Sequence, residues 1–126
     1  MKIDNSNSKL KALIIDDEVD VCFLLSGLLR QKNLEAGFVN SLTEAEKVLQ
    51  AEAPRLIFLD NHLPDGFGLD YISNIKSTLP GSKVIMITAH DTNYDREKAY
   101  KLGADHFIGK PFTRDAIYQT IEQLSA

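Results

Sequence analysis

Charged and hydroxyl side chains follow short apolar runs at four places in the sequence. The set combines three carboxylates, one hydroxyl and one ammonium group: Asp16, Asp17, Asp60, Thr88 and Lys110. Carboxylates that crowd together repel one another unless they are protonated or bridged by a cation. Oxygen ligands select hard divalent cations such as Mg²⁺, Mn²⁺ or Ca²⁺ over softer metals. If the fold gathers these residues, a divalent cation site is expected.

A phosphoryl-transfer site needs the same kinds of residue. Mg²⁺ usually takes one or two carboxylates, keeps several waters and completes its shell with a phosphate oxygen. A neighbouring carboxylate can act as the nucleophile toward phosphorus. The moving oxygens then need positive charge and hydrogen-bond donors, which Lys110 and Thr88 can provide. The residue types therefore predict a metal-assisted aspartyl-phosphate site.

Each of these residues also has an ordinary structural explanation. Adjacent acids after a strand often cap a helix and place negative charge in its first turn, which would explain Asp16, Asp17 and Glu18. Asp60 alone fits a loop or a cap, and Lys110 alone fits a solvated surface charge. Their joint occurrence at four strand ends favours one common site.

The apolar pattern predicts the elements that must position this site. Runs at 12–15, 56–59 and 84–87 are short, rich in strand-formers and apolar without alternation, which is typical of strands covered on both faces. Weaker strands are expected at 35–39 and 106–109. Segments with helical spacing lie between and after them, at 19–32, 42–51, around 69–75, at 92–102 and after Thr113 through Leu124.

Several of these helices carry end signals. A capping-box pattern runs from Ser41 to Glu44, Gly103 stands at a C-terminal cap position, and Thr113 is an N-cap. Strands that alternate with helices predict an α/β fold, an open parallel sheet with helices on both faces. Such sheets place their sites beyond the carboxyl ends of the strands, where the polar residues stand.

Length and composition limit the remaining choices. The chain has 126 residues, 44% hydrophobic and 25% charged, which fits one domain over 9–126 after a polar, flexible tail over 1–8. The single cysteine, Cys22, excludes an intramolecular disulfide and is expected to be a small buried hydrophobe. A net charge of -4 argues against direct nucleic-acid binding. The sequence has no apolar run of membrane length and no signal peptide, so a cytoplasmic location without membrane contact is expected.

Four segments together resemble the receiver domains of two-component response regulators. They are LIIDDE at 13–18, LDNHLPDG at 59–66, ITA at 87–89 and GADHFIGKPF at 103–112. The resemblance extends from Lys9 to the C-terminus. It implies a flavodoxin-like, doubly wound sheet of five parallel strands in the order 2-1-3-4-5, flanked by five helices, as in chemotaxis regulators.

The resemblance also implies a role for each matching residue. Asp60 corresponds to the phosphoacceptor of the family. A Mg²⁺ ion, or Mn²⁺ in its place, would be held by Asp16, Asp17, Asp60 and the backbone carbonyl of His62. The bond between the lysine and proline of KPF, at 110–111, is commonly cis in relatives.

Further positions match the part of the family site that responds to phosphorylation. Thr88 corresponds to the switch hydroxyl and Lys110 to the lysine that contacts the phosphoryl group. Phe107 stands at an aromatic switch position that is often Tyr, so a contact that needs the Tyr hydroxyl is lost here. His62 and His90 occupy rim positions that tune phosphate lifetime in relatives. Because imidazole titrates near neutral pH, we predict that one of them makes dephosphorylation pH-dependent between about pH 6 and 7.

The function implied by the resemblance is that of a signalling switch rather than an enzyme. A histidine kinase or histidine phosphotransfer protein would donate a phosphoryl group to Asp60. The surface of the fourth helix, fifth strand and fifth helix would then change, and a downstream output domain or target protein would read that change. Phosphorylation-dependent homodimers are a further expectation, and autodephosphorylation would reset the switch.

Three other functions share parts of this pattern. A pseudo-receiver would bind partners without phosphorylation, but the complete set of site residues argues against it. A phosphatase of the haloacid-dehalogenase type would need an acid two residues after Asp60, where His62 stands, and usually a threonine where Pro64 stands. A nucleotide- or flavin-binding module would need a glycine-rich loop after the first strand, where the sequence instead has acids.

Overall fold

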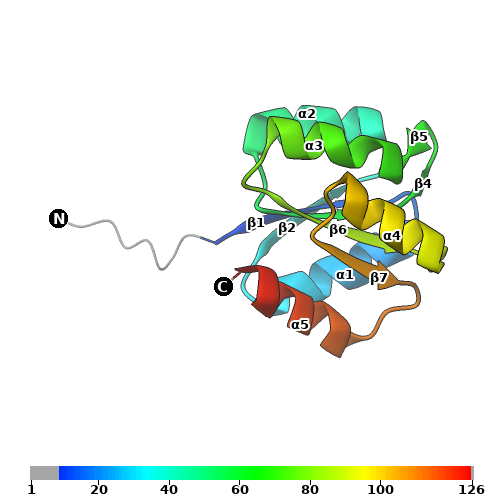
Figure 1. Cartoon of the computed structure of the whole chain (residues 1–126). Coiled ribbons are helices and arrows are strands. Elements are labelled where there is room, and N and C mark those ends of the chain that lie inside the picture. The colour runs from blue at the N-terminus through cyan, green and yellow to red at the C-terminus, as the bar shows by residue number, and fades with distance from the viewer. Residues whose placement is uncertain (1–8, 126) are drawn as a thin grey trace.

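Five parallel strands form the central sheet of the computed structural model, which describes residues 9–125 (Figure 1). The strands are β1 (Lys11–Ile15), β2 (Glu35–Val39), β3 (Leu56–Leu59), β6 (Lys83–Thr88) and β7 (His106–Gly109). They lie in the order β2-β1-β3-β6-β7, which is the order 2-1-3-4-5 when the sheet strands alone are counted. The expected fold and strand order are therefore confirmed. The tail predicted over 1–8 lies outside the described residues.

Helices cover the sheet on both sides (Figure 1). They are α1 (Val19–Gln31), α2 (Leu42–Glu52), α3 (Ile72–Thr78), α4 (Asn93–Leu102) and α5 (Arg114–Ser125). One face of the sheet packs against α1 and α5, and the other packs against α2, α3 and α4. Within residues 9–125, no helix combines the length and the apolarity that crossing a membrane would require.

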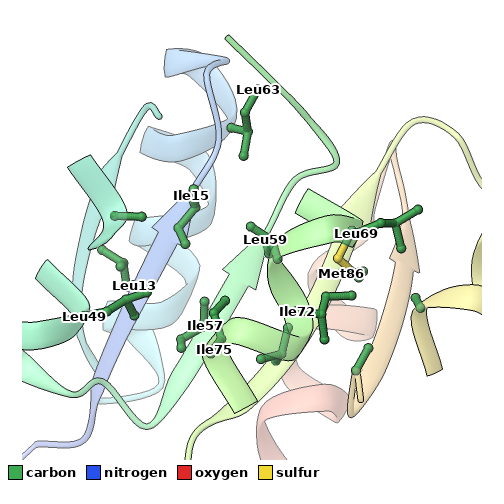
Figure 2. Close-up of a cluster of buried hydrophobic side chains, with 14 of the residues drawn as sticks. Leu13, Ile15, Leu49, Ile57, Leu59, Leu63, Leu69, Ile72, Ile75 and Met86 are labelled. Carbon is green, nitrogen blue, oxygen red and sulfur yellow. The ribbon is translucent and has the colours of Figure 1, made fainter. Parts of the chain in front are cut away.

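Neighbouring strand residues contribute to two separate cores. Leu13 and Ile15 of β1 pack with α2 and α3, whereas Ala12 and Ile14 pack with α1 and α5. The first of these cores is shown in Figure 2. Side chains alternate across a strand, so a run that is apolar at every position must be covered on both faces. The predicted buried strands are confirmed, and Cys22 is fully buried as expected.

The predicted helix ends agree with the structure to within one residue for α1, α2, α4 and α5. Ser41 accepts a hydrogen bond from the backbone N–H of Glu44, and Thr113 accepts one from that of Ala116. Gly103 adopts a φ of 114°, a left-handed conformation that costs glycine little. Asp65 adds a cap that the sequence analysis missed, because its carboxylate accepts hydrogen bonds from the N–H groups of both Leu42 and Thr43 at 2.9 Å.

The segment between β3 and α3 contains more structure than the helix expected around 69–75. Two short strands, β4 (His62–Leu63) and β5 (Gly66–Phe67), pair antiparallel and are followed by a 3₁₀ helix, η2 (Gly68–Tyr71), before α3 begins. Asn61 explains the late start of α3. Its backbone carbonyl accepts from the N–H of Gly68 at 2.8 Å, and its side-chain oxygen accepts from the N–H of Leu69 at 3.0 Å. Strands of two residues are too short to produce a periodic signal.

Candidate functional site

The strand ends bring three carboxylates together at one edge of the sheet. Asp16 and Asp60 follow β1 and β3, and the register that pairs Ile15 with Leu59 places them on adjacent strands. Oxygen atoms of Asp16, Asp17 and Asp60 all lie within 4.8 Å of one another. Asp16 and Asp60 are buried, whereas Asp17 is exposed. The predicted acidic cluster is therefore present as a geometric group.

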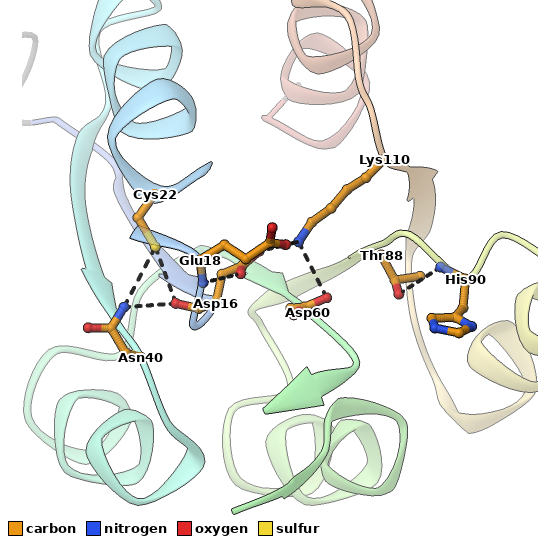
Figure 3. A network of polar contacts seen from close by, with 8 residues as sticks. All are labelled: Asp16, Glu18, Cys22, Asn40, Asp60, Thr88, His90 and Lys110. Carbon is orange, nitrogen blue, oxygen red and sulfur yellow. Dashed lines mark hydrogen bonds and ion pairs between the residues drawn. The ribbon is translucent and has the colours of Figure 1, made fainter. Parts of the chain in front are cut away.

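Lys110 reaches into this cluster from the end of β7 (Figure 3). Its Nζ atom lies 2.8 Å from Asp16 Oδ2, 2.6 Å from Glu18 Oε1 and 3.6 Å from Asp60 Oδ1. Apart from this ion pair, Asp16 Oδ2 has no hydrogen-bond partner among the described residues. The peptide bond between Lys110 and Pro111 is cis. One ammonium group thus faces several carboxylates, and the cluster keeps surplus negative charge.

The burial of the acids affects their protonation. Burial, with the nearby charge of Asp16, raises the pKa of Asp60 to about 6 despite the opposing effect of Lys110. Burial also raises the pKa of Asp16, against the hydrogen bond and charge of Lys110. For Lys110, burial alone would lower the pKa, but hydrogen bonds to Asp16 and Glu18 and the charge of Asp60 outweigh it and raise the pKa. The ammonium therefore stays charged.

The donor set fits a hard divalent cation. Every candidate ligand is an oxygen, and burial, with nearby negative charge, raises the pKa of two of the three acids. Among residues 9–125, a buried oxygen of Asp16 has Lys110 as its sole partner. Oxygen ligands of this kind suit Mg²⁺ or Mn²⁺, whereas the described residues provide no thiolate or imidazole in this cluster.

Backbone contacts hold Asp16 in place. The N–H of Glu18 donates to Asp16 Oδ1 at 2.9 Å, and the side-chain amide of Asn40 donates to the Asp16 carbonyl at 2.8 Å. Cys22 Sγ donates to the same carbonyl at 3.3 Å, and burial raises the pKa of its thiol to about 11. Asn40 was not among the predicted site residues, although it directly follows β2 and is a polar residue at a strand end like the others.

Gly68 contacts the backbone of Asp60 and was also missed, since one glycine in a loop carries no signal of its own. A Cβ atom at this position would stand 2.2 Å from the carbonyl oxygen of Asp60 and 3.0 Å from Leu59 Cγ. The N–H of Gly68 donates to the Asn61 carbonyl, which keeps the two segments in contact. The position of Asp60 therefore depends on the absence of a side chain here.

Substituting this glycine should disturb the site directly. We expect Gly68→Ala to move the backbone of Asp60 and to lower the unfolding free energy by about 1 to 3 kcal/mol, the usual range for overpacking. Urea denaturation measures this loss. The matched control is Gly81→Ala, because a Cβ at Gly81 meets nothing within 4 Å. Equal stability of the two variants would contradict the role given to Gly68.

Thr88 and His90 lie at the end of β6, beside the cluster (Figure 3). The hydroxyl of Thr88 is buried and accepts a hydrogen bond of 3.2 Å from the backbone N–H of His90. Both His90 and His62 are exposed at the rim, and their ring centroids are 4.3 Å apart. The fold thus brings the two predicted rim histidines into contact.

Phe107 is 3% exposed on β7 and contacts α4 through Arg96. The guanidinium carbon of Arg96 lies 4.7 Å from the ring centroid, a cation–π distance. Arg96 also donates to Asp91 at 2.6 Å. This arrangement connects the aromatic side chain to α4 and to the loop that precedes it.

Comparisons with known proteins show similar sequences and a similar fold. The family model described as "Response regulator receiver domain" matches residues 12–122. The chain is 38% identical over 104 residues to the response regulator protein PilR of Pseudomonas aeruginosa, covering 82% of this chain and 23% of that protein. It is 35% identical over 121 residues to the transcriptional regulatory protein BasR of Escherichia coli, covering 91% and 52%. The chain thus spans about half or less of the length of these relatives.

A solved structure provides the corresponding comparison of the fold. The beryllofluoride-activated NtrC4 receiver domain dimer superposes with a TM-score of 0.86 at 35% identity. The match covers 90% of this chain and 94% of that one.

Proposed function

This chain belongs to the response regulator receiver domain family, and we propose that it is a signalling switch controlled by phosphorylation of Asp60. The observation that supports this most is the position of the Asp60 carboxylate, next to two further acids and 3.6 Å from the Lys110 ammonium. The raised pKa of about 6 still leaves most of the carboxyl group ionised, and so nucleophilic, near pH 7.

The proposed donor is a phosphohistidine of a histidine kinase or a histidine phosphotransfer protein. A carboxylate oxygen of Asp60 attacks the phosphorus, an O–P bond forms, and the N–P bond of the donor breaks. The donor imidazole keeps the electron pair of that bond and takes up a proton. The Lys110 ammonium lies 3.6 Å from Asp60 Oδ1. A small movement of this group would bring it into contact with the phosphoryl oxygens on Asp60, where it would neutralise their charge.

Mg²⁺, or Mn²⁺ in its place, is the cofactor that we propose for this reaction. Asp16, Asp17, Asp60 and the backbone carbonyl of His62 would hold it. When bound, such an ion neutralises negative charge on the phosphoryl oxygens. Lys110 already partly offsets the same carboxylates, so binding of the ion and the position of the lysine are expected to be coupled.

Thr88 and Phe107 are the proposed switch residues. The Thr88 hydroxyl accepts a hydrogen bond from the backbone N–H of His90. On phosphorylation, it would turn and donate a hydrogen bond to the new phosphoryl group. Thr88 pairs in register with Gly109 of β7, two residues after Phe107, and Arg96 connects that ring to α4. A contact made only in the phosphorylated state would shift the surface of α4, β7 and α5.

Beryllium fluoride, a phosphoryl mimic, tests this switch by NMR. With Mg²⁺ present, we expect amide shifts at Asp60, at Thr88 and along α4. Thr88→Ala should still bind the mimic at Asp60 but lose the shifts along α4. Unchanged α4 shifts in that variant would contradict the role of Thr88, and absence of binding in the parent chain would favour a pseudo-receiver.

The proposed partners follow from this switch. The activated surface would be read by an output domain or a target protein, and a homodimer formed on phosphorylation is one such assembly. The similar NtrC4 receiver domain forms a beryllofluoride-activated dimer, which supports that proposal. A cytoplasmic location and autodephosphorylation as the resetting step remain predictions.

His62 and His90 are proposed to set the lifetime of the phosphoryl group, since both are exposed beside the site. We expect His62→Ala or His90→Ala to change the dephosphorylation rate and to flatten its dependence on pH between about pH 6 and 7. Phosphate release, followed over time in Mg²⁺ without other metals, measures this rate. If the parent chain itself shows a flat profile, the prediction is wrong.

A further inference from the structure

Two histidines from different strand ends lie side by side at the rim of the acidic cluster. His62 belongs to β4, and His90 belongs to the loop between β6 and α4. Their ring centroids are 4.3 Å apart and their planes are tilted by 40°. His62 also packs edge-on against Phe67, with centroids 5.5 Å apart. The two residues are far apart in the sequence, so this pair depends on the fold.

Within residues 9–125, neither imidazole ring takes part in a hydrogen bond, so both rings can act as ligands. His90 makes its hydrogen bond to Thr88 through its backbone N–H, not through its ring. Asp91, the neighbouring acid, is already paired with Arg96 at 2.6 Å. Both histidine residues are exposed, so their side chains can rotate. Because the ring centroids are only 4.3 Å apart, rotation of these exposed side chains can bring one nitrogen of each ring to a shared ion.

We propose that His62 and His90 form a binding site for a late first-row divalent cation, such as Ni²⁺ or Zn²⁺. Imidazole nitrogen suits these ions, whereas Mg²⁺ prefers carboxylate and carbonyl oxygens. The site is therefore chemically distinct from the acidic cluster. The surplus negative charge of that cluster attracts cations to this edge of the sheet. Two protein ligands leave further coordination positions to water, so the bound ion is exchangeable.

Occupancy of this site would connect two segments that flank the phosphoacceptor. His62 follows Asp60 by two residues, and His90 follows Thr88 by two residues. An ion held by both rings ties β4 to the loop after β6. The movement of Thr88 requires that loop to adjust, so the ion is expected to slow phosphorylation. This consequence rests on the proposed function, whereas the metal site itself does not.

The test is a titration of the tag-free chain with Ni²⁺ in excess Mg²⁺, which occupies the oxygen ligands. Calorimetry should show one Ni²⁺ per chain. Paramagnetic broadening in ¹H NMR should remove the ring signals of His62 and His90 and spare those of His106. His106 is partly buried on β7 beside Arg96, so it provides the control within the same chain.

Three histidine variants separate the proposed site from nonspecific binding. His62→Ala and His90→Ala should each weaken Ni²⁺ binding by about tenfold or more, because one ligand remains. His106→Ala should bind as the parent chain does. Unchanged affinity in the first two variants, or equal broadening of all three histidines, would overturn the proposal. Thermal melting verifies that the variants are folded.

One acid variant separates this proposal from the proposed function. Asp17→Asn should abolish Mg²⁺-dependent phosphorylation while leaving Ni²⁺ binding intact. Loss of Ni²⁺ binding in this variant would place the ion on the carboxylates instead of the histidines. A chain that binds Ni²⁺ through both rings but is never phosphorylated would overturn only the proposed function.

Discussion

Replacing Lys110 with alanine is expected to destabilise the metal-free domain by about 3 kcal/mol at pH 7, since it leaves buried acids without their cation. Its Nζ lies 2.8 Å from Asp16 Oδ2, and that oxygen has no other partner among the described residues. The same substitution should slow phosphorylation by a small phosphodonor roughly 100-fold, since a charged donor to the phosphoryl oxygens is removed. Urea denaturation and intact-protein mass spectrometry measure the two effects.

The pH dependence of this loss identifies its cause. Without the ammonium or a metal ion, the acids lower their repulsion by binding protons, so the deficit should shrink as the pH falls from 7 to 5. Mg²⁺ should also restore part of the stability, because the ion replaces the missing positive charge. Lys98→Ala, on the exposed surface of α4, is the control and should change little. A Lys110→Ala deficit that is the same at both pH values would contradict an electrostatic origin.

Asp60→Asn should have the opposite effect on stability. The folded-state pKa of Asp60 is raised to about 6, above the 3.8 of an unperturbed aspartate. Between these values the folded chain holds a proton that the unfolded chain has lost, so stability falls as the pH rises from about 4 to 6 and stays lower above it. The amide removes this penalty. We expect a gain of about 2 to 3 kcal/mol at pH 7 without Mg²⁺, because one pKa unit corresponds to about 1.4 kcal/mol.

A second pH provides the internal check for this variant. At pH 4 the Asp60 carboxyl group is protonated in the folded chain, so the difference between Asp60→Asn and the parent chain should nearly vanish. Asp70→Asn, at an exposed position, should leave stability unchanged at both pH values. If Asp60→Asn is less stable than the parent at pH 7, the account of the acidic cluster is wrong. A site that costs stability in the resting protein is expected where function requires crowded charge.

Much of the fold could be predicted because the short apolar runs of the strands differ clearly from the helical spacing of apolar residues between them. A short, continuous apolar run such as that at Leu56–Leu59 is typical of a strand covered on both faces, and this run is a fully buried strand in the structure. The strand order depended on the resemblance to a known family, since alternation alone allows several orders. The two short strands within His62–Phe67 and the 3₁₀ turn at Gly68 could not be predicted. Strands of two residues give no periodic signal, and the contacts of Asn61 with Gly68 and Leu69 form only in the folded chain.

In the candidate site, too, some residues could be predicted from the sequence and others could not. Residues at strand ends, such as Asp16, Asp60 and Lys110, could be found because parallel strands deliver their ends to one edge. Residues that act through backbone contacts, such as Gly68, carry no signal until the chain is folded. The contact between His62 and His90 is also a product of tertiary structure, since β4 and the loop after β6 are far apart in the sequence.

Phosphorylation by acetyl phosphate tests the central proposal most directly. The parent chain, Asp60→Asn, and the parent chain with EDTA are incubated with acetyl phosphate and Mg²⁺, then weighed by intact-protein mass spectrometry. The account predicts a gain of one phosphoryl mass in the parent chain with Mg²⁺ and in neither of the other samples. A gain that persists in Asp60→Asn, or a parent chain that neither gains mass nor binds beryllium fluoride, would contradict it.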